Sequence, residues 1–545
     1  MPSELVFGFE TEWMSFSAGA EPEMVAACAL RALAQQVPHL PFHNGNGIFL
    51  ENSSRCYLDC GHIETCTCEV SSPLDLVATV KAMERILLHI SQSASRLLGA
   101  HAAIKFGRAN VDPSSAFTYG QHESYLSAHP SDFYAEYLLP FLVTRPVWSG
   151  AGGLVPGSPG VAFAVAPRLL LFSSAAGNDT TGSRAIINLR NEPLAKPGNH
   201  RLHIIAGETL SSERGLYLKA GVTALAVRAA DLGAKIGIEV RDPVKSLHVV
   251  ARDPSCKEKI PLRDGRRLTA VQIQSEYLAL IEKYLPDLPA WAPAVCRCWR
   301  TALAALAEDP LLLGRTLDWP IKYNIWKAHL KKLDVHADGK DLLAELREAA
   351  SNTAYRDTAP SLELLLGPSS PILGRVAELN AILRQRGLKW TQLNSLAADR
   401  ARLSEILDVR FGILGEGLFD VLDRQGVLEH RVLDAEPIER AIREAPPGTR
   451  AHLRSQAIKE LAGRTDAACS WEWVVDKKRG ALDLSDPREQ SAHWQQTASL
   501  THDEIAARAY QLWHERGCSE GSPEVDWIWA ERQLREELER RTGGV

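Results

Sequence analysis

The stretch RCYLDCGHIETCTCE, residues 55–69, decides how the rest of this chain is organised. Side chains alternate along a strand, so the polar residues of the stretch fall on one face and the small apolar residues on the other. Gly61 permits a turn in the middle. The polar side chains are Arg55, Tyr57, Asp59, Glu64 and Glu69. So many neighbouring carboxylates repel one another unless a cation lies among them; a surface hairpin with solvated charges is the alternative.

A second acidic pair lies near the N-terminus, in LVFGFETEW at residues 5–13. Glu10 and Glu12 are two positions apart and therefore share one strand face. Two carboxylates in an apolar setting are costly to bury without a metal or an arginine. Divalent cations such as Mg²⁺ prefer carboxylate oxygens and often hold substrate phosphates as well. The two acidic strands together predict a Mg²⁺–nucleotide site.

Composition indicates an ordinary globular protein and excludes several classes. The 545 residues suggest two or three domains, and 45% hydrophobic with 23% charged residues is typical of a large packed core. A net charge of −6 gives no broad basic field, so we expect no nucleic-acid partner and no membrane surface. The sequence has neither a long apolar run nor a leader pattern, and we expect a cytoplasmic protein.

Four cysteines cluster in the deciding stretch, at positions 56, 60, 66 and 68. Their spacing lacks the paired C-x2-C units of zinc sites. Small buried side chains are therefore favoured over a zinc cluster.

The pairing of GFETEW with residues 55–69 resembles the Pup ligase and Pup deamidase/depupylase family, which are relatives of glutamine synthetase and the carboxylate-amine ligases. Eight further segments match that family in order, and the resemblance covers roughly residues 5–330 and 405–480. These segments are NVDPSSAFTYGQHESYL (110–126), LLPFLVTRPVWSGAG (138–152), INLRNEP (187–193), RLHIIAGETLSSERGLYLKAGVTAL (201–225), LDWPIK (317–322), GLFDVLDRQG (417–426), PPGTRAHLR (446–454) and SWEWVV (470–475). The resemblance implies an α+β fold with a glutamine synthetase-like antiparallel sheet packed by helices.

Three regions follow from this resemblance and from composition. Residues 1–434 form the catalytic domain, with a helical insertion at about 335–400 for which the family motifs offer no counterpart. Residues 435–495 form a small C-terminal domain that completes the nucleotide site. Residues 500–545 read as a helical hairpin, an accessory tail that is expected to be dispensable for catalysis and open to an unknown protein partner.

The resemblance also implies roles for individual residues. Asp59 matches the catalytic base, Glu10 and Glu64 match metal ligands, and Tyr57 matches a metal-site position. Three residues match nucleotide-binding positions: Arg55, Thr67 and Trp471, although Trp471 is a core residue by composition alone. Charge and strand phase add Glu12 and Glu69 as further metal ligands.

Four more residues are candidates for binding the metal or the nucleotide, on sequence patterns that are less specific. His203 lies on a strand where the glutamine synthetase relatives carry a histidine beside the metal, and it is otherwise a satisfied core residue. Arg201 shares its strand face and is assigned to the nucleotide. Arg450 and Arg454 fall on one helical face, which suits phosphate or carboxylate; a solvated face is the alternative.

These assignments imply an ATP- and Mg²⁺-dependent ligase. It would activate the side chain of a C-terminal glutamate on a small Pup-like modifier and join it to a lysine of a target protein.

Two kinds of sequence feature bear on the branch of the family. Only a helix and a short loop fill the interval between Glu10 and Asp59, which favours the ligase branch over a depupylase or deamidase. The segments PLDLV (73–77) and LDWPIK favour the hydrolase branch. A small-molecule carboxylate-amine ligase and a pseudoenzyme are further alternatives. Leu194, where the family has a histidine, marks the chain as divergent.

Overall fold

The computed structural model describes residues 5–336 and 404–542, apart from gaps at 44, 100–102, 113–116, 157–161, 180–181, 496–501 and 516–522, and a few isolated positions between 381 and 402. Most of the predicted insertion at 335–400 therefore lies outside the described residues. Among the helices that are described, none is both long and apolar enough to cross a membrane.

The centre of the molecule is one large sheet, whose strands follow the order β10-β11-β12-β7-β1-β5-β4-β3-β2, with β6 also paired to β1. The predicted antiparallel arrangement is confirmed at every pair except β10–β11, which is parallel. The strands are β1 Phe7–Phe16, β2 His39–Pro41, β3 Ile48–Leu50, β4 Arg55–Asp59, β5 His62–Cys66, β6 Lys105–Gly107, β7 Gln121–Ser127, β10 Ser174–Gly177, β11 Ala185–Asn188 and β12 His200–Ile204. Two short hairpins are separate from it, formed by β8 Gly153–Leu154 with β9 Phe163–Ala164 and by β13 Lys259–Pro261 with β14 Arg267–Thr269.

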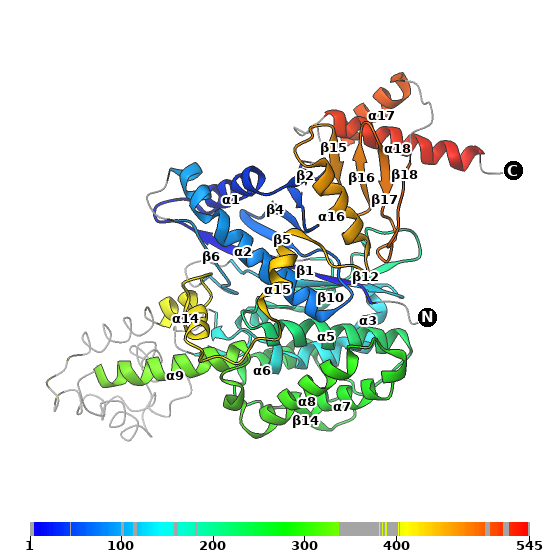
Figure 1. Ribbon diagram of the computed structural model, residues 1–545. Coiled ribbons are helices and arrows are strands. Elements are labelled where there is room, and N and C mark those ends of the chain that lie inside the picture. The colour runs from blue at the N-terminus through cyan, green and yellow to red at the C-terminus, as the bar shows by residue number, and fades with distance from the viewer. Residues whose placement is uncertain are drawn as a thin grey trace.

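Helices cover one face of this sheet (Figure 1). The α-helices are α1 Pro22–Gln36, α2 Pro73–Leu98, α3 Ser131–Thr144, α4 Pro146–Ser149, α5 Glu213–Asp231, α6 Pro243–Arg252, α7 Ala270–Glu282, α8 Ala292–Glu308, α9 Asp318–His336, α14 Leu418–Arg424, α15 Ala435–Arg443, α16 Arg450–Leu461, α17 His502–Glu515 and α18 Pro523–Thr542. Phe7 and Phe9 of β1 point into the core shared with α2 and α5, which leaves the alternate residues of β1 for the opposite face. The α+β prediction is confirmed.

Local sequence signals explain the elements that frame the site. Ser72 caps α2 by accepting a hydrogen bond from the backbone N–H of Leu74, and Pro73 begins the helix. Ser53, in the predicted turn between β3 and β4, has a φ of 66°, and Gly61, which joins β4 to β5, has a φ of 83°.

The small C-terminal domain is built on a second antiparallel sheet of four strands, β15 Ala467–Cys469, β16 Trp473–Asp476, β17 Gly480–Asp483 and β18 Trp494–Gln495. Helix α16 packs on this sheet and on β2 and β3. Helix α15, which the sequence grouped with this domain, packs instead on α2, where Ala441 contacts Ala78 and Ala82.

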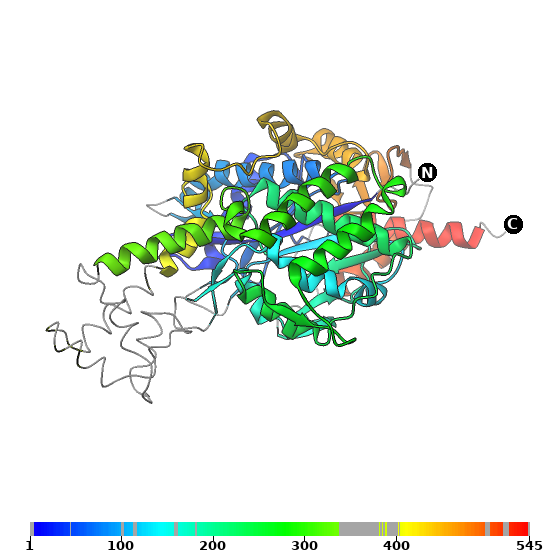
Figure 2. The same ribbon diagram turned by 90° about the horizontal axis from the view of Figure 1, so that it is seen from below.

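The predicted helical hairpin at the C-terminus is present as α17 and α18, and it packs against the small domain's sheet (Figure 1). Val525 and Ile528 of α18 form a common apolar cluster with Trp473 and Val475 of β16. In the view of Figure 2, α18 and α9 lie at opposite ends of the molecule.

Candidate active site

Strand register brings the predicted acidic residues together on the open face of the large sheet. Glu12 of β1 lies directly opposite Glu64 of β5, and Tyr57 of β4 lies opposite Glu64 on its other side. Glu10 lies opposite His122 of β7. These side chains line one cavity of about 560 Å³, which we call the acidic cavity.

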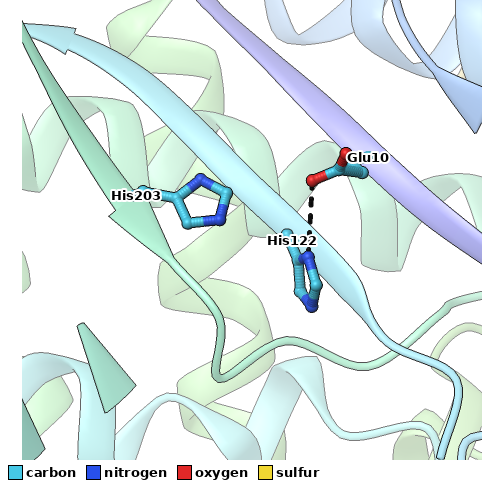
Figure 3. A group of neighbouring side chains, drawn as sticks. All are labelled: Glu10, His122 and His203. Atoms are coloured by element: carbon cyan, nitrogen blue, oxygen red, sulfur yellow. Dashed lines mark hydrogen bonds and ion pairs between the residues drawn. The ribbon is translucent and has the colours of Figure 1, made fainter. Parts of the chain in front are cut away.

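Two groups of metal-binding side chains lie within the acidic cavity. One consists of Glu10, His122 and His203, from three neighbouring strands (Figure 3). The other consists of Glu12, His62 and Glu64. In each group the candidate ligand atoms all lie within 4.8 Å of one another, and mixed carboxylate and imidazole donors suit a divalent cation. The two groups are adjacent, because His122 lies 3.4 Å from a carboxylate oxygen of both Glu10 and Glu12.

The electrostatics of the cavity also favour a bound cation. Burial raises the pKa of Glu64 to about 7, and the neighbouring charges of Glu10 and Glu12 add to the shift despite a hydrogen bond with His62. Burial also opposes ionisation of Glu10, but the hydrogen bond and charge of His122 outweigh it and hold the pKa of Glu10 below its usual range. Tyr57 donates hydrogen bonds to both Glu10 and Glu64. A divalent cation would relieve this repulsion, and the carboxylate oxygens of Glu10, Glu12 and Glu64 are ligands of the kind that Mg²⁺ takes.

Asp59 occupies a different position in the same cavity. It is the last residue of β4, its side chain is exposed, and the structure places it on the cavity lining. Four arginines also line the cavity, Arg168, Arg184, Arg190 and Arg201, of which Arg168 is buried and donates to the backbone carbonyls of Ile205 and Gly207. Guanidinium groups bind phosphate and carboxylate in a bidentate manner. The acidic cavity thus combines metal-type ligands, the exposed carboxylate of Asp59 and a set of anion-binding groups.

A second cavity of about 270 Å³ adjoins the first, and we call it the nucleotide cavity. Glu10 and Arg201 line both cavities. The nucleotide cavity is also lined by four of the predicted cofactor residues, Arg55, Thr67, Arg450 and Trp471. It is therefore formed by both domains. The ring of Trp471 is half-buried and meets Phe49 edge-on at a centroid distance of 4.9 Å.

Thr67 is held by β1 at the base of the nucleotide cavity. Its hydroxyl accepts a hydrogen bond of 3.0 Å from the backbone N–H of Phe9. A Cβ added at Gly8 would lie 3.2 Å from the same hydroxyl oxygen, so the glycine allows this close approach.

Glu69 does not fit the metal-ligand role predicted for it. Its carboxylate binds two buried arginines of α16: Arg450 Nε lies 2.7 Å from one oxygen, and Arg454 donates to both oxygens. Burial by itself raises the pKa of Glu69. The charges and hydrogen bonds of Arg454 and Arg450 have the larger, opposite effect, so the pKa of Glu69 is lowered to about 2. Arg454, predicted to bind the cofactor, lines neither cavity and is fully buried. Glu69 therefore links the two domains, and its carboxylate oxygens are engaged by arginines.

The sequence places His122 in a polar cluster of segment 110–126 for which a substrate-side or catalytic-cleft role is expected, but it does not assign His122 as a metal ligand. It lies in the polar segment 110–126, which mixes two environments because the side chains of β7 alternate. Glu123 points the other way and forms a fully buried ion pair of 2.6 Å with Arg145. The sequence signal that could have identified His122 is strand alternation, because His122 and Glu123 point to opposite faces of β7. The buried positions of Cys56, Cys66 and Cys68 agree with small packed side chains, whereas Cys60 is exposed.

Comparison with known proteins extends the resemblance along most of the chain. A family model described as "Pup-ligase protein" matches residues 11–362 and 379–475, which leaves only residues 363–378 of the predicted insertion unmatched. A second model, described as "Protein of unknown function (DUF2934)", matches residues 501–536.

Both branches of the family are represented among the relatives. A depupylase from Acidothermus cellulolyticus is 38% identical over 296 residues, which are 52% of this chain and 58% of that enzyme. A Pup–protein ligase from Kocuria rhizophila is 30% identical over 500 residues, which are 87% of this chain and 92% of that enzyme. The structure of the Pup ligase PafA in complex with ADP has the same fold, with a TM-score of 0.60, 24% identity and coverage of 87% of this chain and 92% of its own.

Proposed function

Because this chain belongs to the Pup-ligase family, we propose that it is an ATP- and Mg²⁺-dependent ligase. Its substrates would be a small Pup-like modifier with a C-terminal glutamate and a target protein with an accessible lysine. The observation that carries the proposal is the junction of the two cavities, where Glu10 and Arg201 line both. A triphosphate bound at Trp471 would extend its terminal phosphoryl group through this junction toward Asp59.

The cavity residues suit phosphoryl transfer to a carboxylate. The side-chain carboxylate of the modifier's glutamate would attack the γ-phosphorus of ATP, forming an acyl phosphate and releasing ADP. Arg201 at the junction and Arg190 beside it would bind and orient the two anionic reactants. Mg²⁺ held by the two carboxylate–histidine groups would supply charge stabilisation for the phosphoryl group.

Asp59 suits the second half of the reaction. The target lysine is protonated at neutral pH and must lose a proton before its nitrogen attacks the acyl carbon. Asp59 is exposed at the cavity lining, so its carboxylate is accessible to take this proton. Attack forms the isopeptide bond and releases inorganic phosphate.

A depupylase or deamidase is the second candidate, and the 38% identity to the Acidothermus depupylase favours it. In that case water would replace lysine as the nucleophile and the isopeptide bond would be cleaved. The ligase is supported by the longer match to the Kocuria enzyme and by the short interval between Glu10 and Asp59, which α1, β2 and β3 occupy. Since ATP is the co-substrate in our proposal, we place the activity in the cytoplasm.

One pair of incubations tests the assignment. The purified full chain is mixed with ATP, Mg²⁺, a Pup-like polypeptide ending in Gly-Gly-Glu and a lysine-bearing acceptor protein, and products are followed by intact mass spectrometry. We expect a conjugate whose mass is the sum of both partners less one water, with equimolar ADP. In the second incubation, a preformed conjugate is supplied in place of the free partners.

The outcomes separate the candidates. Cleavage of the preformed conjugate without any ATP-dependent conjugation would assign the chain to the hydrolase branch. Consumption of ATP with free glutamate and a small amine, but not with the polypeptide, would indicate a small-molecule ligase. No reaction in any mixture, together with intact nucleotide binding, would indicate a pseudoenzyme.

A further inference from the structure

The C-terminal hairpin contacts the small domain through an aromatic stack on its outer surface. The ring of Trp529 in α18 stacks on that of Trp473 in β16, with centroids 4.8 Å apart and an interplanar angle of 28°. Val525 and Ile528 complete the apolar contact with the sheet. The hairpin is thus a packed layer of the small domain.

The same tryptophan also reaches the catalytic domain. The turn between β2 and β3 carries His43, whose ring centroid lies 5.7 Å from that of Trp529 and 5.3 Å from that of Trp473. The backbone N–H of His43 donates a 3.2 Å hydrogen bond to the carbonyl of Cys469 in β15. Trp529 therefore packs where the turn of one domain meets the sheet of the other.

The turn between β2 and β3 also contacts Arg55, a residue that lines the nucleotide cavity. The ring of Phe42, next to His43, lies 4.0 Å from the guanidinium carbon of Arg55, within cation–π range. Arg55 also donates a 2.9 Å hydrogen bond to the carbonyl of Asn46 in the same turn. The contacts form a continuous path from Trp529 through His43 and Phe42 to Arg55. No residue of α17 or α18 that the structure describes lines the nucleotide cavity itself.

We propose that the C-terminal hairpin positions Arg55 for nucleotide binding, with Trp529 as its principal positioning residue. This inference rests on the proposed use of that cavity for ATP. Trp529 acts at a distance: it packs against His43, and the neighbouring ring of Phe42 holds the guanidinium of Arg55 against the cavity. Loss of the indole ring would free the turn and lower the affinity for ATP, while the metal-type ligands on β1, β5, β7 and β12 keep their places.

The test compares point variants of the full chain. Removal of one aromatic contact corresponds to roughly a threefold to tenfold change in affinity. Trp529→Ala is expected to raise the KM for ATP by that factor with kcat changed by less than about twofold, and Trp529→Phe is expected to restore most of the loss. Tyr510→Ala is the matched control, because Tyr510 belongs to the same hairpin but is 64% exposed. Hydrogen exchange of this turn is measured in each variant at the backbone amides of Phe42, His43, Gly45 and Gly47.

The readouts distinguish failure of this inference from failure of the proposed function. Faster exchange of the turn and a higher KM in Trp529→Ala alone support the positioning role. An unchanged turn overturns it, whether or not the chain uses ATP. If the wild-type chain does not bind ATP, the proposed function fails, and the exchange result still decides whether Trp529 holds the turn. An equal loss in Tyr510→Ala would show general unfolding of the hairpin and would also overturn the specific role of Trp529.

Discussion

Asp59 differs from Glu10, Glu12 and Glu64 in having an exposed side chain at the end of its strand. A base must be free of strong partners if it is to accept a proton from lysine. We expect Asp59→Asn to lower the rate of conjugate formation by roughly 10²- to 10⁴-fold, the usual contribution of a general base. The affinity for ATP, measured by calorimetry, is expected to stay within about twofold because Asp59 does not line the nucleotide cavity.

The control for this change is Asp132→Asn, which removes an exposed carboxylate at the start of α3, away from both cavities. It is expected to leave the rate unchanged. Full activity in Asp59→Asn would remove Asp59 from the mechanism.

Glu69 is a residue whose partners define its role. Arg450 is 3% exposed and Arg454 is fully buried, so a Glu69→Ala change leaves two buried guanidinium groups without their carboxylate. Breaking a buried pair in this way destabilises a protein by about 3–5 kcal/mol. We expect a loss of that size in denaturant unfolding, with no change in the Mg²⁺ concentration that gives half-maximal activity.

The comparison for Glu69 is Glu460→Ala, which breaks a solvent-exposed pair with Arg479. A pair of this kind contributes about 1 kcal/mol or less. A Glu69→Ala protein of normal stability that needs more Mg²⁺ would restore Glu69 as a metal ligand.

At the scale of elements, the register of the central strands builds the acidic cavity. β1 lies between β7 and β5, so its even-numbered residues meet ligands from both sides, Glu10 facing His122 and Glu12 facing Glu64. A one-residue slip of either pairing would turn these side chains into the apolar core. The buried Phe7 and Phe9 oppose such a slip.

The contact between α14 and α5 contains a buried histidine that makes stability depend on pH. His430 accepts a 3.2 Å hydrogen bond at Nδ1 from the backbone N–H of Glu213, and its Nε2 donates across 3.0 Å to Asp423. The Nδ1 lone pair exists only in the neutral ring. Burial, followed by the charge of Lys81, lowers the pKa of His430 to about 4 from its ordinary 6.5.

The sign of the effect follows from proton binding. Between pH 6.5 and 4 the unfolded chain binds a proton at His430 and the folded chain does not, so stability falls as pH falls through this window. From pH 7.5 to pH 5.5 this histidine alone is expected to remove about 1.4 kcal/mol. Denaturant unfolding at the two pH values measures it. In His430→Gln, which does not titrate, the loss over the same interval is expected to be smaller by that amount, and equal losses would exclude His430 as the cause.

For the whole molecule, the nucleotide cavity joins two domains. Arg55 and Thr67 come from the large sheet, whereas Trp471 and Arg450 come from the small domain, and Glu69 ties the two together. ADP with Mg²⁺ is therefore expected to stabilise both domains. At a concentration 100 times the Kd, a single-site ligand stabilises the folded state by about 2.7 kcal/mol.

Scanning calorimetry with and without ADP measures this coupling. We expect one main transition that moves to higher temperature as a whole. Two separate transitions, of which only one moves, would show that the nucleotide contacts a single domain and would contradict the shared cavity.

The sequence alone determined the local pieces of the site. Period-two alternation placed Glu10 with Glu12 and Tyr57 with Asp59, and Gly61 indicated where the chain reverses between β4 and β5. These features depend on neighbours within a few residues, which is why they can be read directly. The family motifs then indicated which strands belong together.

Only the tertiary structure decided which side chains from distant parts of the sequence contact one another in the site. It brought His122 to Glu10, turned Glu69 toward Arg450 and Arg454, and seated Trp529 against His43. Each of these contacts joins residues far apart in the chain, through the register of the sheet or the packing of one domain on another. Local periodicity shows the face on which a side chain lies, but the partner it meets there depends on the arrangement of the whole chain.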